Sequence, residues 1–142
     1  REEEEEERLR QLELERQRAE EEERQRRLRE EQRALEEERR KQQEEEAEAR
    51  RRAKQEQLDQ FLSNHGFAGV NERKKKSGMF SSGFTYPLHV AVKAIDAQAV
   101  EVLLWAEADK SLKDSDKLTP LALAQKLDKK GSHKLVVGAL LA

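Results

Sequence analysis

No glycine or proline occurs between Arg1 and Leu62, and about two thirds of the positions in this stretch carry a charge. Residues 1–60 contain 23 acidic and 17 basic residues, whereas residues 61–142 contain 8 acidic and 12 basic ones. A segment so poor in apolar side chains cannot build a core, so only the second part, about 80 residues long, can form a globule. That length is marginal for a domain that stands alone.

The residues of the first part favour a long helix that its own surface charges stabilise. Glutamate, arginine, glutamine, leucine, alanine and lysine are all strong helix formers. Glutamate precedes arginine or lysine by four residues at nine places, for example in Glu6–Arg10, Glu23–Arg27 and Glu37–Lys41. Each such pair stabilises an isolated helix by about 0.2–0.5 kcal/mol. We therefore expect a solitary charged helix over residues 1–60.

A coiled coil, or a helix lying on a partner, is the main alternative for this segment, and disorder is another. A coiled coil needs apolar residues at both seam positions over three or four heptads. Leu14, Leu28 and Leu35 share one heptad phase, but Glu21 and Gln42 interrupt it, and the companion position is polar throughout. The seam is interrupted more often than it is filled, which favours the solitary helix.

Two similar motifs recur in the second part of the chain. Thr-Tyr-Pro-Leu-His-Val-Ala occupies residues 85–91 and Thr-Pro-Leu-Ala-Leu-Ala occupies residues 119–124, so Pro87 and Pro120 are 33 residues apart. Ala-Glu-Ala-Asp at residues 106–109 lies between the two motifs. This segment resembles the ankyrin-repeat family, which has the same period.

The resemblance implies an all-α fold in which helix pairs stack and the loops between them form fingers. It implies a partial capping repeat with an enlarged finger over residues 61–84, a full repeat over 85–118 and a terminal repeat over 119–142. The long helix is then expected to end as the last helix of the partial repeat and to cap the stack, because repeat arrays need about three units or caps to cover their core.

The expected helices can be placed from the motifs and their caps. They cover about residues 87–94, 97–106, 120–128 and 132–141. Thr119 is expected to cap the third of them, because its side chain can accept a hydrogen bond and Pro120 suits the first helical position. The family's turn glycines are replaced here by Ile95, Glu107 and Lys117.

The sequence contains no group of residues that indicates catalysis. The absence of cysteine excludes disulfide scaffolds and thiolate metal sites, and no apolar run reaches the roughly 18–20 residues of a membrane span. His89 lies in the repeat motif, His65 precedes a glycine at a helix end, and His133 begins the last expected helix, so each suits a structural role. We therefore predict no enzymatic activity, no cofactor and no metal site.

A run of four basic residues falls in the expected enlarged finger: Arg73, Lys74, Lys75 and Lys76. A solvated loop tip, a contact with an acidic protein surface and a nuclear localisation signal all fit this run. Ser77, Ser81 and Ser82 follow it, and a phosphate there would offset the positive charge. The net charge of −2 argues against general nucleic-acid binding.

Trp105, the only tryptophan, lies at a repeat position that is usually polar and outward-facing. It can pack on the enlarged finger at Met79, Phe80 and Phe84, anchor a partner protein, or be tolerated at the surface. We expect the finger or a partner to cover at least about half of it in the working assembly, because an exposed tryptophan is unfavourable and tryptophan is enriched in binding hot spots. With the basic run, the candidate partner-binding residues are Trp105, Phe80, Lys113 and Asp114.

As the resemblance implies, ankyrin repeats bind proteins and have no chemistry of their own. Charged helices of this kind resemble rods in motor and cytoskeletal proteins. We therefore expect an intracellular, cytoplasmic or cytoskeletal scaffold in which a rigid helix positions a protein-binding module within a large assembly. A regulatory adaptor that captures a signalling partner, or a regulatory segment of a larger enzyme or channel, is the alternative. Because the chain begins with Arg1 rather than methionine, we expect it to be a piece of a longer protein.

Overall fold

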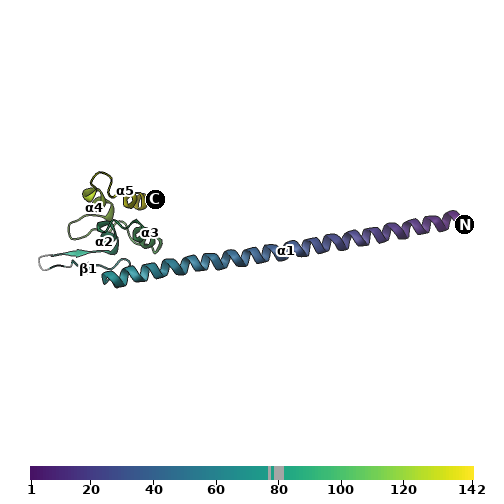
Figure 1. Ribbon diagram of the computed structural model, residues 1–142, viewed down its shortest axis with the longest axis horizontal. Helices are drawn as coiled ribbons and strands as arrows, with labels where there is room; N and C mark the ends of the chain where they lie inside the picture. Colours follow the sequence, from purple (N-terminus) through teal and green to yellow (C-terminus); the bar gives the residue numbers. More distant parts are fainter. Residues whose placement is uncertain (77, 79–81) are drawn as a thin grey trace. The chain divides into compact units, whose positions relative to one another are not determined.

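The computed structural model describes residues 1–76, 78 and 82–142, and this part of the chain is mostly helical (Figure 1). Its helices and strands are, in chain order, α1 (Glu2–His65), β1 (Lys74–Lys75), β2 (Phe84–Thr85), α2 (Pro87–Lys93), α3 (Ala97–Trp105), α4 (Pro120–Leu127) and α5 (Lys134–Leu141). The prediction of a mostly helical chain with a long first helix is confirmed. The chain divides into two compact units, Arg1–Ala49 and Arg50–Ala142.

The first unit is a stretch of α1 in which every side chain is exposed. Predicted ion pairs form here, among them Arg10–Glu6, Arg27–Glu23 and Lys41–Glu37, with N–O distances of 3.9, 2.9 and 4.0 Å. Four glutamates in the first turn also interact favourably with the helix dipole. Within this unit, helix stability therefore comes from local backbone and side-chain contacts and not from burial.

In the second unit, α1 ends at the predicted residue, His65, and its end is a Schellman motif. The Phe67 N–H donates to the Leu62 carbonyl at 2.9 Å, and the Gly66 N–H donates to the Ser63 carbonyl at 3.2 Å. Gly66 has a φ of 72°, which glycine adopts without steric cost. A local glycine signal thus sets the end of this helix.

Helices α2 and α3 end with the same motif, although neither has a glycine there. Ile95 and Glu107 take the left-handed position, with φ angles of 55° and 66°. The wider hydrogen bond of the Schellman motif also forms at both helix ends. The Asp96 N–H donates to the Ala91 carbonyl at 3.0 Å, and the Ala108 N–H donates to the Leu103 carbonyl at 2.9 Å. Lys117, the third residue that takes the place of a turn glycine of the ankyrin family, has a φ of 63°. All three positions therefore keep the backbone conformation that favours glycine.

The starts of the short helices agree with the sequence prediction to within two residues. Thr119 caps α4 as expected, because its hydroxyl accepts a hydrogen bond from the Ala122 N–H at 3.2 Å. Asp96 caps α3 in the same way through the Ala99 N–H at 3.0 Å, a cap that the sequence analysis did not identify. Tyr86 precedes α2 without a side-chain cap.

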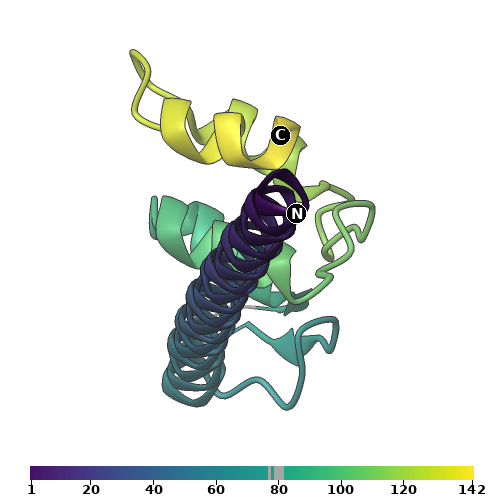
Figure 2. The same cartoon turned by 90° about the vertical axis from the view of Figure 1, so that its right-hand side faces the viewer.

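The four short helices form two successive pairs, α2 with α3 and α4 with α5 (Figure 2). Helix α2 also packs on α4, and α3 packs on α5. Leu103 and Val100 of α3 are completely buried, and Leu58 from the last turns of α1 belongs to the same core. In α4 the buried leucine is Leu123, whereas Leu121 is only partly buried.

The two loops that precede α2 and α4 form fingers. In the first, which we call finger 1 (residues 72–84), β1 and β2 pair antiparallel, with Lys74 opposite Thr85 and Lys75 opposite Phe84. The second, finger 2 (residues 112–118), is a tight turn without a strand. The enlarged finger 1 therefore contains a short β-ladder that its lysine-rich sequence did not predict.

Candidate functional site

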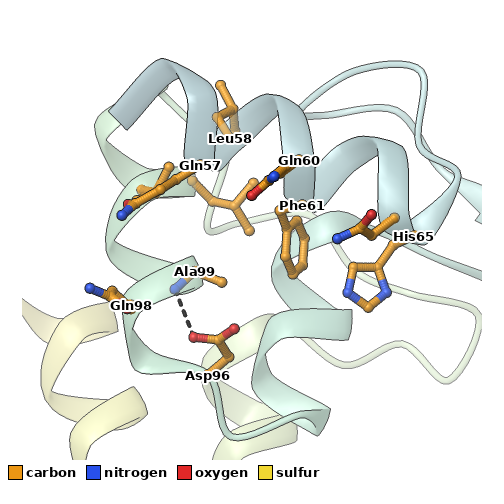
Figure 3. A pocket seen from close by; sticks show the side chains of 11 residues that line it. Gln57, Leu58, Gln60, Phe61, His65, Asp96, Gln98 and Ala99 are labelled. Carbon is orange, nitrogen blue, oxygen red and sulfur yellow. Dashed lines mark hydrogen bonds between the residues drawn. The ribbon is translucent and has the colours of Figure 1, made fainter. Parts of the chain in front are cut away.

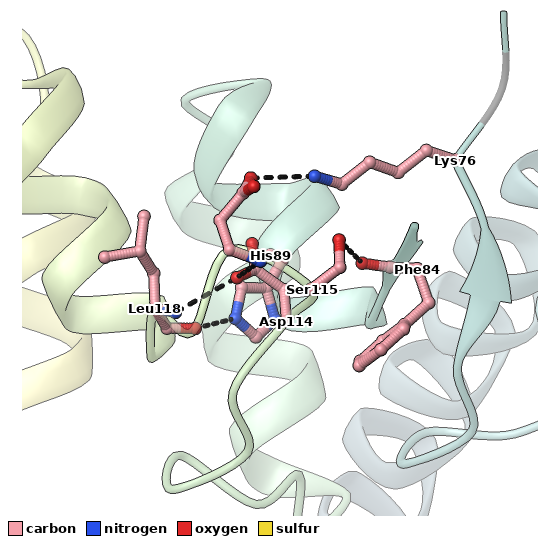
Figure 4. A network of polar contacts seen from close by, with 7 residues as sticks. Lys76, Phe84, His89, Asp114, Ser115 and Leu118 are labelled. Atoms are coloured by element: carbon pink, nitrogen blue, oxygen red, sulfur yellow. Dashed lines mark hydrogen bonds and ion pairs between the residues drawn. The ribbon is translucent and has the colours of Figure 1, made fainter. Parts of the chain in front are cut away.

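The side chain of Asp114 holds finger 2 together (Figure 4). Its Oδ1 atom accepts hydrogen bonds from the backbone N–H groups of Asp116 at 3.0 Å and Leu118 at 3.1 Å. The Asp114 N–H donates to the Leu118 carbonyl at 3.0 Å. Asp114 is 3% exposed. We selected it as a partner-binding candidate, but the structure places it inside the finger.

Finger 1 and finger 2 are joined by polar contacts. The Ser115 hydroxyl donates to the Phe84 carbonyl at 3.2 Å, and the Ser115 N–H donates to the same oxygen at 3.3 Å. The Lys76 ammonium group forms an ion pair with Asp116 at 2.8 Å (Figure 4). At Gly83, which has a φ of 108°, any Cβ would collide with the Ser115 side chain. Glycine is therefore required where the fingers meet.

His89 connects α2 to finger 2. Its Nε2 atom lies 2.8 Å from the Leu118 carbonyl oxygen, so the ring is in the tautomer that carries the proton on Nε2. Burial lowers the pKa of His89 below its usual value, although the Leu118 hydrogen bond acts in the opposite direction. The structural role that the sequence predicted for this histidine is consistent with that geometry.

Three buried polar atoms of this junction have no hydrogen-bond partner within the described part of the chain. They are Thr85 Oγ1, His89 Nδ1 and Asp114 Oδ2. The nearby charge of Asp114 raises the pKa of His89, whereas Lys93 and Lys76 lower it. The junction is therefore a buried polar network that connects α2 to the two fingers.

The basic run of finger 1 is largely engaged within the protein. The Lys74 ammonium group donates to the His65 carbonyl and lies 4.7 Å from the Phe67 ring centroid. The Arg73 guanidinium lies 4.5 Å from the ring centroid of Phe84. Lys76 is ion-paired, whereas Lys75 is exposed. Lys74 and Lys75 belong to a strand, so they are not at the tip of a solvated loop.

Three lysines stabilise the ionised carboxylate of Asp116. The hydrogen bond and charge of Lys76 lower its pKa, and the charges of Lys126 in α4 and Lys93 in α2 lower it further. Lys93 and Lys126 are 33 residues apart, the same spacing as Pro87 and Pro120. Sequence reasoning missed this cluster, although the 33-residue spacing of the two lysines was visible.

A groove lies between the last turns of α1 and the start of α3 (Figure 3). The Phe61 ring contacts His65 with centroids 4.4 Å apart, and the Asp96 carboxylate is engaged at the cap of α3. The amide side chains that line the groove are Gln57, Gln60, Asn64 and Gln98. These groups can donate and accept hydrogen bonds, but they form no acid–base pair that could carry a reaction.

Trp105 is 39% exposed at the end of α3. The Lys54 ammonium group of α1 lies 5.7 Å from its ring centroid, within the range of a cation–π contact. We had not anticipated cover from α1. Phe84 contacts Tyr86, with ring centroids 5.9 Å apart, while Met79 and Phe80 lie outside the described residues. Cover of Trp105 by finger 1 or a partner therefore stays a prediction.

The remaining candidates are less informative. Lys113 is exposed in finger 2, and Ser77 and Ser81 lie outside the described residues. Within the described ranges, no three histidine, aspartate or glutamate side chains are grouped to hold a metal ion. None of the described helices combines the length and apolar character that crossing a membrane requires.

Comparison with known proteins identifies no family for this chain. No protein-family model matches the chain, and no curated protein matches it significantly. The resemblance to ankyrin repeats thus rests on the motifs, and any function inferred from it is a proposal.

Proposed function

We propose that the chain is a non-enzymatic scaffold in which a charged helix positions an ankyrin-type module that binds another protein, within a cytoskeletal or other large assembly. The proposal needs two properties: a helix that persists without a core, and a stack of similar units that presents a surface to a partner.

The observation that carries the proposal is the repetition of one helix end in three places. Gly66 after α1, Ile95 after α2 and Glu107 after α3 all adopt left-handed φ angles, of 72°, 55° and 66°. A non-glycine residue in this conformation costs roughly 1–2 kcal/mol. Sequences without glycine therefore reach the same backbone, which supports a common repeat architecture for these segments.

Contacts between equivalent turns give further support. The Asn71 amide oxygen accepts a hydrogen bond from the Asp109 N–H at 2.8 Å, and its amide nitrogen donates to the Glu107 carbonyl at 3.3 Å. Asn71 lies in the loop after α1, and the two groups that it binds lie in the loop after α3. Such contacts between neighbouring repeats are typical of repeat proteins, which use extended surfaces for binding.

The surface of the module suits protein binding better than chemistry. Trp105 combines partial exposure with an aromatic ring, and tryptophan is one of the residue types that contribute most to protein interfaces. Several titratable groups of the fingers are used in ion pairs and turns, among them Lys76, Asp114 and Asp116. A partner that contacts α3 and finger 2 would bury Trp105 and Lys113.

Site-specific photo-crosslinking tests this function. The full chain, carrying benzoylphenylalanine in place of Trp105 or Lys113, is expressed in cells and irradiated. We expect both positions to crosslink to the same protein, and we expect that protein to sediment with large assemblies. The matched control carries the crosslinker at Leu135, which is 77% exposed on α5.

The control makes the result interpretable. Equal crosslinking from Leu135 would indicate nonspecific contact, and the absence of a crosslinked protein from both test positions would contradict a protein-binding module. Circular dichroism of each variant verifies that the helices are intact before the comparison is made.

A further inference from the structure

The first helices of the two pairs carry lysines at equivalent positions. Lys93 lies six residues after Pro87, and Lys126 lies six residues after Pro120. Helices α2 and α4 pack directly against each other, so these lysines follow one another on neighbouring helices. Both are exposed, and neither forms an ion pair with another described residue.

A carboxylate of the protein already lies among these cations. Asp116 of finger 2 forms an ion pair with Lys76 at 2.8 Å, and its side chain is 60% exposed. The charges of Lys126 and Lys93 also lower the pKa of this carboxyl group. The cluster of Lys76, Lys93 and Lys126, which we call the lysine face, thus stabilises a carboxylate and leaves two of its lysines without an ion pair.

Acidic residues are scarce around the lysine face. Helices α2 and α4 contain no aspartate or glutamate. Of the two acids in finger 2, Asp114 is buried and Asp116 is paired with Lys76. Lys117, Lys113 and Lys75 add further positive charge from the fingers. Asp128, the C-cap residue of α4, adds a carboxylate whose Oδ1 accepts the His133 N–H at 2.9 Å. An anionic partner therefore meets more cations than carboxylates at this face.

We infer that the lysine face binds an acidic segment of another protein, in which carboxylates two or three residues apart contact Lys93 and Lys126. Packed helices lie about 8–10 Å apart, and an extended chain advances about 3.3 Å per residue. Two carboxylates at that spacing in an extended segment can therefore reach both lysines. This inference deepens the proposed function and rests on it.

A carboxylate partner fits better than a nucleic acid. The cations form a short cluster and not a long stripe, and the chain has a net charge of −2, with most of its acids in residues 1–60. Nucleic-acid binding usually relies on a clear basic excess. A long polyanion needs a positive surface along its length, whereas a short acidic segment needs only a local positive potential.

Binding of a defined peptide to the full chain tests the inference. The probe is a fluorescein-labelled peptide of twelve residues in which six glutamates alternate with glycine and serine. The reference peptide has glutamine in place of each glutamate. Fluorescence anisotropy is recorded in 50 mM and 500 mM NaCl. We expect only the glutamate peptide to bind, and its affinity to fall at the higher salt concentration because exposed charges are screened.

Charge reversal locates the contact. The double variant Lys93→Glu/Lys126→Glu is expected to weaken peptide binding at least about tenfold, since two contacts become repulsive. The matched control, Lys130→Glu/Lys134→Glu, makes the same change in net charge at two exposed lysines outside the lysine face. It should change the affinity less than about threefold, because exposed charges at a distance are screened. Thermal unfolding confirms that both double variants are folded.

Other outcomes overturn the inference. These are binding of the glutamine peptide, equal loss in the two double variants, no binding of either peptide, or tighter binding of single-stranded oligo-dT. Sedimentation of the protein without a peptide tests in addition whether the chain associates with itself. Self-association that Lys93→Glu/Lys126→Glu abolishes would assign the lysine face to the acidic helix of a second copy. Failure of the peptide experiment with crosslinks from Trp105 rejects this inference alone, whereas loss of both crosslinks rejects the proposed function.

Discussion

The first unit and the second unit of this protein reach stable helices by different means. In Arg1–Ala49 no side chain is buried, and even the leucines, such as Leu28 at 52%, are exposed. In Arg50–Ala142 the helices are only 7 to 9 residues long after α1, but Leu103 and Val100 are completely buried. Helices this short are marginal alone. The comparison teaches that length and ion pairs can replace a core, whereas short helices need one.

Removing a core side chain should reveal most clearly that the stability of the two units has different sources. Leu103→Ala is expected to destabilise the second unit by about 2–5 kcal/mol, because a cavity adds to the lost burial. Urea unfolding followed by Trp105 fluorescence measures the loss, while circular dichroism should show that most of the long helix persists. The control Leu28→Ala removes an equally large side chain from an exposed position and should change stability by less than about 0.5 kcal/mol. A Leu103→Ala loss no larger than that of the control would contradict the difference between the units.

Acidification should destabilise the second unit through His89. Its pKa is lowered in the folded state by burial, so the unfolded state takes up the proton more readily. Above the usual histidine pKa of about 6.5 both states are neutral and stability is complete. As the pH falls below that value, the unfolded state gains protons first and stability is lost.

Thermal unfolding at pH 7.5 and pH 5.5 measures this effect. The variant His89→Gln cannot titrate and should show a smaller difference between the two pH values. The control His65→Gln changes a histidine outside the buried network and should keep the full difference. An unchanged pH dependence in His89→Gln would remove His89 as the cause.

Relief of backbone strain should stabilise the second unit. Ile95 has a φ of 55° and is 49% exposed, so only part of its side chain is buried. Ile95→Gly is expected to raise the free energy of unfolding by about 1 kcal/mol, since glycine adopts left-handed conformations without steric cost. Lys93→Gly, within helix α2, should instead lower it by a similar amount. Equal destabilisation by both changes would show that the left-handed conformation at Ile95 carries no strain.

Salt should affect the first unit more than the second. A peptide of residues 1–60 is expected to be helical and monomeric at micromolar concentration, with helicity that falls moderately as salt increases. The reason is that exposed ion pairs are screened at high ionic strength. Circular dichroism and analytical ultracentrifugation measure both properties. A stable dimer would replace the solitary helix with a coiled coil, and Leu14, Leu28 and Leu35 would then belong to its seam.

The sequence by itself determined the local structure of this protein. The end of α1 at His65 and the cap by Thr119 follow from signals a few residues long, and the repeat motifs place the starts of the short helices to within two residues. The left-handed residues Ile95 and Glu107 coincide with positions where a glycine is usual. Such features are predictable because each depends on hydrogen bonds and steric limits within one or two turns of chain.

Tertiary structure alone decided which charged side chains meet. Lys76 and Asp116 are 40 residues apart, and Asp114 became a buried turn residue and not an exposed candidate. Lys54 covers Trp105 from α1, and Lys93 and Lys126 become neighbours only when α2 packs on α4. Periodicity identifies the face of a helix, but the ion pairs on that face depend on the packing of distant elements, because a charge interaction requires proximity in space and not in sequence.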